Sequence, residues 1–140
     1  MPVSTQLLYN PGMVARDKVG SPEQQLDQIV QRIVEACAPD KIILFGSHAY
    51  GEPGPESDFD LLILKDTPDS PRDRRFQVRK ALWHLTTTIP VEPLVLTEAE
   101  LARRLAMGDQ FMQEIVTRGV TLYDHGRVEP TERVARNRGA

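Results

Sequence analysis

The sequence has one cysteine, no long apolar run and no large excess of either charge. The single Cys37 excludes an internal disulfide framework and a zinc site built from cysteines. No stretch approaches the roughly 18 apolar residues of a membrane span, and no secretory leader opens the chain, so we expect a cytoplasmic location without membrane contact. With 17 basic and 20 acidic side chains, the chain has a net charge of -3, which gives no reason to expect direct nucleic-acid binding.

The length and the hydrophobic content of the chain suffice for one domain of ordinary size. Its 140 residues, 40% of them hydrophobic, can bury a core without metal or disulfide support. Proline and glycine among short apolar pieces predict an irregular arm over residues 1–20, and a polar, arginine-bearing run predicts a tail over residues 125–140. The expected domain therefore spans residues 21–124.

Apolar spacing and capping signals predict helices alternating with strands. Ser21, Pro22 and Gln24 form a helix start, and Thr97 with Glu100 forms a second one. Phe76 and Trp83 are interpreted as core residues of a helix, and Pro93 favours an edge position for its strand. The segment 47–57 is predicted to be a loop. Helices are expected over about 22–37, 73–88, 97–107 and 110–118, and strands over 42–45, 59–64, 91–96 and 120–123. This order predicts an α/β (α+β) layer protein, with a small mixed sheet flanked by helices.

Two aspartates stand side by side at the start of the second expected strand. Asp58 and Asp60 are two residues apart, so their side chains project from the same face of an extended segment. At roughly 5 Å and an effective dielectric of about 20, their repulsion is on the order of 3 kcal/mol, which a cation would offset. Mg²⁺ is the cation most often held by one or two carboxylates together with substrate phosphates. The pair therefore indicates phosphoryl or nucleotidyl chemistry.

A Gly-Ser turn lies directly upstream of these carboxylates. Gly46 and Ser47 follow a strand, where backbone N–H groups and a hydroxyl can approach a phosphate, and Gly51 keeps the turn compact. The segment from Gly46 to Gly51 is close to a Walker A loop, but Glu52-Pro53 stands where that motif requires Lys and then Ser or Thr. We therefore reject a P-loop.

Together these residues carry a resemblance to a known family. Gly46-Ser47-x3-Gly51-x5-Ser57-Asp58-x-Asp60-Leu61, between two apolar strands, resembles the signature of the DNA polymerase β-like nucleotidyltransferases. The chain is most similar to their minimal prokaryotic branch, the MNT (MntA-type) antitoxins encoded beside a HEPN-domain toxin. The resemblance covers about residues 21–124 and implies the polymerase β-like fold.

The resemblance also implies roles for individual residues. Asp58 and Asp60 match the pair that holds Mg²⁺ and, through it, the nucleoside triphosphate, in a site that takes two metal ions. Gly46 and Ser47 match the phosphate-binding loop, and Ser57 is expected at the nucleotide site, where fixing the turn before Asp58 is the favoured role. Glu92 occupies the place of a third acid, a ligand or base, where small family members usually have Asp.

Two functions are compatible with this sequence. In the first, the protein is an enzyme that transfers a nucleoside monophosphate, expected to be AMP from ATP, to a hydroxyl group. The resemblance makes a tyrosine of a HEPN toxin the leading acceptor. In the second, the fold is a binding module with weak or no catalysis, which neutralises a protein partner by contact. Glu92 is the residue that distinguishes the two functions. Its side chain is one methylene longer than that of Asp, and a site that aligns metal and phosphate loses rate when a group is displaced.

Overall fold

The computed structural model describes residues 20–126. The arm predicted over residues 1–20 and the tail predicted over residues 125–140 therefore lie almost entirely outside the described residues. None of the helices in the described part has the length and apolar character that crossing a membrane requires.

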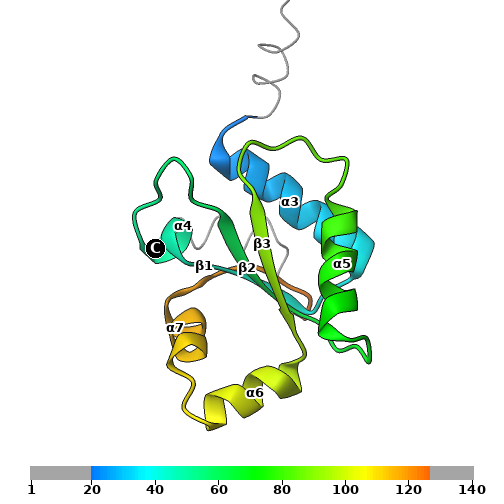
Figure 1. The fold of residues 1–140 in the computed structure, drawn as a ribbon, viewed down its shortest axis with the longest axis vertical. Coiled ribbons are helices and arrows are strands. Elements are labelled where there is room, and N and C mark those ends of the chain that lie inside the picture. The colour runs from blue at the N-terminus through cyan, green and yellow to red at the C-terminus, as the bar shows by residue number, and fades with distance from the viewer. Residues whose placement is uncertain (1–19, 127–140) are drawn as a thin grey trace, which may run out of the picture.

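Helices and strands alternate along the described chain (Figure 1). The helices are α3 (Pro22–Cys37), α4 (Ser47–Tyr50), α5 (Pro71–Ala81), α6 (Glu98–Ala106) and α7 (Gln110–Arg118). The strands are β1 (Lys41–Phe45), β2 (Phe59–Leu64), β3 (Val91–Leu96) and β4 (Val120–Asp124).

The strands form one mixed sheet in the order β3-β2-β1-β4. β1 pairs antiparallel with both β2 and β4, whereas β2 pairs parallel with β3. The register places Asp60 of β2 between Phe45 of β1 and Glu92 of β3. Pro93 lies in the edge strand, as predicted, where a missing N–H need not interrupt the ladder.

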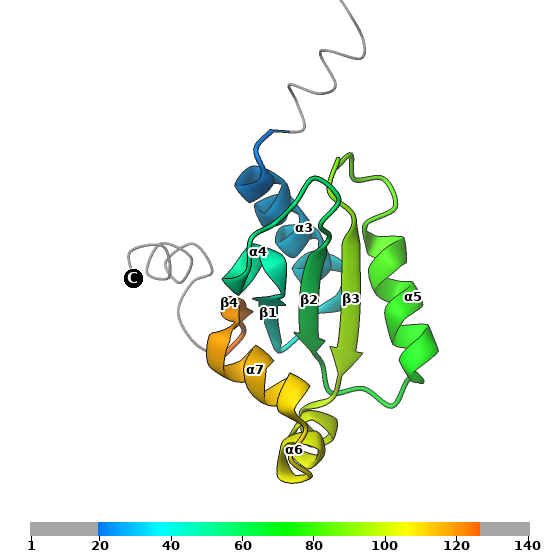
Figure 2. The same cartoon turned by 60° about the vertical axis from the view of Figure 1, so that its left-hand side comes forward.

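Helices cover both faces of this sheet (Figure 2). α3 and α5 pack on one face, around a core that includes Ile33, Ile42 and Leu61. α6 and α7 pack on the other face, against Leu62 and Met112 among others. Because side chains alternate along a strand, β1 and β2 contribute to both cores, and this explains why Leu61 through Leu64 are all buried. The predicted layer architecture is therefore confirmed.

Capping residues set the helix starts as the sequence predicted. The Ser21 side chain accepts a hydrogen bond from the Gln24 N–H, and the Gln24 side chain accepts one from the Ser21 N–H. Thr97 and Glu100 form the same reciprocal pair at α6. Asp109 accepts from the Met112 N–H at the start of α7.

Two expectations about secondary structure were wrong. The segment 47–57 is not wholly a loop, because Ser47–Tyr50 forms the short helix α4. The helix expected over 73–88 ends at Ala81, and the assignment of Phe76 and Trp83 to the core was also wrong. Phe76 is 57% exposed and Trp83 is 70% exposed.

A side chain on α3 explains the early end of α5. The Oε1 atom of the buried Gln25 accepts hydrogen bonds from the backbone N–H groups of Thr88 (2.9 Å) and Ile89 (3.3 Å). These donors are therefore used by a distant residue rather than by a continuing helix. Threonine, which occupies residues 86–88, also has a low helix propensity.

Candidate active site

Gly46 connects β1 to α4 in a conformation that only glycine adopts readily. Its φ of 78° and ψ of -155° lie in a region that is strongly unfavourable for residues with a Cβ atom. A Cβ atom at this position would collide with Oδ2 of Asp60 and lie 3.2 Å from its Cγ. The Asp60 carboxylate therefore packs directly against the Gly46 backbone, and the glycine is required for both space and conformation.

Three carboxylates lie near one another at this end of the sheet. Asp60 is paired in register with Glu92 on the neighbouring parallel strand, and Asp58 lies two residues before it, just ahead of β2. Burial raises the pKa of the Asp60 carboxyl, and the negative charges of Asp58 and Glu92 raise it further, while His48 lowers it. Asp60 therefore lies in a negative environment that favours a proton or a cation.

The loop between α4 and β2 is held by contacts at both ends. The His48 ring packs on the Phe59 ring with centroids 4.6 Å apart. Nε2 of His48 lies 3.4 Å from the Ser57 carbonyl oxygen, and the Gly54 N–H donates to Ser57 Oγ at 2.8 Å. Ser57 therefore holds the turn that precedes Asp58.

Hydrogen-bond donors remain free at the start of α4. The Gly46 carbonyl accepts from the N–H groups of Ala49 and Tyr50, each at 3.0 Å. Among residues 20–126, neither the Ser47 hydroxyl nor the N–H groups of Ser47 and His48 make a hydrogen bond. This end of β1 therefore presents unpaired donors next to the carboxylate cluster.

Glu92 has cationic partners that the sequence analysis did not identify. Its Oε2 accepts from Arg75 at 2.7 Å and its Oε1 accepts from Arg79 at 3.4 Å, both on α5. The two arginines are one helical turn apart, so they present their guanidinium groups on the same side of α5. In the sequence, the basic run at residues 72–80 is the one signal that points to these partners.

Only two of the three carboxylates are available to bind a cation. Asp58 and Asp60 make no ion pair among residues 20–126, and oxygen ligands of this kind suit Mg²⁺. In the same part of the chain, no three His, Cys, Asp or Glu side chains are grouped closely enough to hold a metal ion. Asp58 and Asp60 therefore fit a metal site completed by substrate phosphates, whereas Glu92, as it lies, is engaged by arginines.

The mixed four-stranded sheet flanked by helices matches a nucleotidyltransferase fold. The sequence profile of the nucleotidyltransferase domain family matches residues 24–116. The chain belongs to this family, and the domain supports a transferase activity. No curated protein matches the chain.

One solved structure supports the same fold. A crystal structure of a candidate nucleotidyltransferase from Sulfolobus solfataricus superposes with a TM-score of 0.54 at 17% identity, over 85% of this chain and 92% of that one. A mutant MntA–HpeT toxin–antitoxin structure gives a TM-score of 0.47 at 19% identity, over 81% of this chain and 83% of that one. The second similarity is too low to support a functional inference.

Proposed function

We propose that the protein transfers a nucleoside monophosphate, AMP from ATP, to a hydroxyl group of a protein partner. The observation that carries this proposal is the Asp60 carboxylate, which packs on the Gly46 turn next to Asp58 and to the unpaired donors of Ser47. This arrangement joins an anion-binding turn to carboxylates that favour a cation, which is what a metal–triphosphate complex requires.

Each residue has a separate task in the proposed transfer. The Ser47 hydroxyl and N–H would bind phosphate oxygens, and Asp58 and Asp60 would hold Mg²⁺. Bound Mg²⁺ would supply Lewis-acid polarisation of the phosphate and a lower pKa for the acceptor hydroxyl. The acceptor oxygen bonds to the α-phosphorus as the bond to the bridging oxygen breaks, and pyrophosphate leaves. The acceptor proton goes to solvent. If Arg75 and Arg79 release the Glu92 carboxylate, that carboxylate can take the proton instead.

The proposed identity of the acceptor rests on the sequence motif around Asp58 and not on the geometry of the site. The resemblance of residues 46–61 to MNT antitoxins supports a tyrosine of a HEPN toxin as the acceptor, so the protein would act as an antitoxin.

A second function is favoured by the ion pairs of Glu92. If Arg75 and Arg79 hold Glu92 permanently, the third acid is missing and catalysis is weak. The protein would then neutralise its partner by direct contact, with the nucleotidyltransferase fold serving as a binding module.

A transfer assay separates these functions. ATP labelled on the α-phosphate is incubated with Mg²⁺, the purified protein and a cell lysate or the product of the adjacent gene. We expect label on a discrete protein, and we expect Asp58→Asn/Asp60→Asn to abolish it. The double variant Asp66→Asn/Asp73→Asn removes the same charge at exposed positions outside the site and serves as the matched control. No label, together with recovery of an intact partner complex, would contradict the enzyme and support the binding module.

A further inference from the structure

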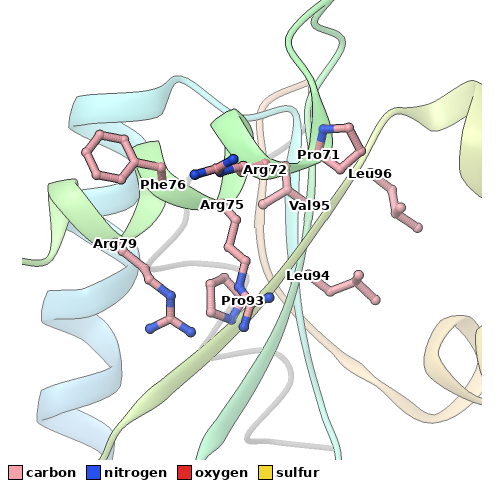
Figure 3. A pocket seen from close by; sticks show the side chains of 9 residues that line it. All are labelled: Pro71, Arg72, Arg75, Phe76, Arg79, Pro93, Leu94, Val95 and Leu96. Carbon is pink, nitrogen blue, oxygen red and sulfur yellow. The ribbon is translucent and has the colours of Figure 1, made fainter.

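A groove runs along the free edge of the sheet, between α5 and β3 (Figure 3). It has a volume of about 490 Å³. Its wall on α5 is basic and its floor on β3 is apolar. The residues that matter for recognition are Arg72, Arg75, Phe76 and Arg79 of α5, and Pro93 and Val95 of β3.

The backbone of β3 is unpaired on the groove side. Within residues 20–126, β3 pairs with β2 alone. At the ends of this ladder, the Phe59 N–H donates to the Pro90 carbonyl and the Lys65 N–H donates to the Leu96 carbonyl. Since alternate residues of a strand face the same neighbour, the peptide groups of Val91, Pro93 and Val95 point away from β2. Pro93 has no N–H, so this side of β3 offers three carbonyl groups but only the N–H groups of Val91 and Val95. A row of this kind is a template for an added strand.

The charge of the groove favours an acidic occupant. Arg72, Arg75 and Arg79 carry three positive charges, and Glu92 is their one acidic partner among the described residues. Arg72 makes no ion pair in that part of the chain. Residues 1–19 and 127–140 both contain more basic than acidic side chains, so charge disfavours either segment as the occupant.

Apolar contact is available beside these charges. Phe76 lines the groove and is 57% exposed, although the helix that carries it packs on the sheet. An extended segment places alternate side chains on opposite sides, so acidic residues can face the arginines while apolar residues face Phe76. Arginine is enriched among the residues that dominate binding energy, and phenylalanine is enriched at interfaces.

We propose that this groove receives an extended acidic segment of a partner protein, which adds a strand to the sheet beside β3. The proposal depends on the proposed function only in that both require a protein partner. It concerns binding and needs neither nucleotide nor metal.

The test uses the full chain and a fluorescein-labelled peptide of alternating Glu and Val, six residues long to match β3. Fluorescence anisotropy at low salt should show saturable binding that weakens as salt is added, because charged contacts are screened. A peptide of alternating Lys and Val should not bind. An acidic peptide with N-methyl groups on alternate amides should also fail, since it cannot form the ladder.

Variants locate the binding surface. Arg72→Glu should weaken peptide binding by about tenfold or more. Lys80→Glu, an exposed charge reversal on the same helix but outside the groove, should leave binding unchanged. Equal effects of the two variants, binding of the Lys-Val peptide, or no binding of the acidic peptide would overturn the proposal. Self-association that Arg72→Glu abolishes would also overturn it, because the occupant would then be a second copy of the chain.

The outcomes remain distinct from those of the transfer assay. Asp58→Asn/Asp60→Asn should still bind the acidic peptide saturably, even if it transfers no nucleotide. Transfer to an acceptor without peptide binding would remove the groove proposal and leave the enzyme intact.

Discussion

Replacing Gly46 by alanine tests the geometry of the site most directly. The backbone at Gly46, with φ of 78° and ψ of -155°, costs a residue with a Cβ atom about 1–3 kcal/mol. The new methyl group would also displace the Asp60 carboxylate, and an off-rotamer side chain costs a further 0.5–1.5 kcal/mol or so. We expect Gly46→Ala to lower the free energy of unfolding by about 2–4 kcal/mol.

Gly108→Ala is the matched control for this substitution. Gly108 also has a positive φ, of 82°, but a Cβ atom there would meet nothing within 4 Å. Gly108→Ala should therefore lower the free energy of unfolding only by the cost of the backbone conformation, roughly 1–2 kcal/mol. Urea unfolding of both variants measures the difference, which reports the collision with Asp60.

A double-mutant cycle isolates that collision. In an Asp60→Ala background, the carboxyl group is absent and the nearest remaining atom of residue 60 is its Cβ, at 3.4 Å. Gly46→Ala should then cost about 0.5–1.5 kcal/mol less than in the unmodified chain. In the chain with Asp60 intact, nucleotide transfer should fall by about a hundredfold for each 1 Å by which the carboxylate moves. An unfolding cost equal to that of Gly108→Ala, with no loss of transfer, would refute the reasoning.

Two further predictions concern the arginines of α5. Arg74 is buried and donates to both carboxylate oxygens of Glu100, at 2.8 and 3.3 Å, so Arg74→Ala should destabilise the domain by about 1–3 kcal/mol in thermal or urea unfolding. The Arg74 hydrogen bonds lower the pKa of Glu100, so this stability is present above the unfolded-state pKa of glutamate and is lost as pH falls through the folded-state value. Arg74→Ala should therefore flatten the acid side of the stability profile, and an unchanged slope would contradict the assignment. Separately, at saturating acceptor concentration, Arg75→Gln/Arg79→Gln should free Glu92 and raise the rate of transfer measured with labelled ATP. If Glu92→Gln has no effect in that background, Glu92 is not a third acid.

The helix starts could be predicted because capping is local. Ser21, Thr97 and Asp109 each satisfy backbone donors within three residues of themselves, so the chain segment alone specifies the start of the helix. The end of α5 depends instead on Gln25, which is 63 residues away from Thr88 in the sequence. Apolar periodicity through Trp83 could not reveal that contact.

The site was predictable to a similar degree. The Gly46 turn and the aspartate pair are contiguous in the sequence, and the predicted strands brought Glu92 beside Asp60. The partners of Glu92 were not predictable, since they depend on which side of α5 faces the edge of the sheet. The burial of Arg74 depends on the same rotation of the helix.

Arg75 belongs to two environments at once, the groove and the ion pair with Glu92. An acidic segment in the groove would compete with Glu92 for this guanidinium group, and a freed Glu92 would increase the negative charge near Asp60. Groove occupancy and cation binding would therefore share a coupling free energy. By thermodynamic reciprocity, the factor by which the segment changes cation affinity must equal the factor by which the cation changes affinity for the segment. A partner that fills the groove would in this way prepare the site that modifies it.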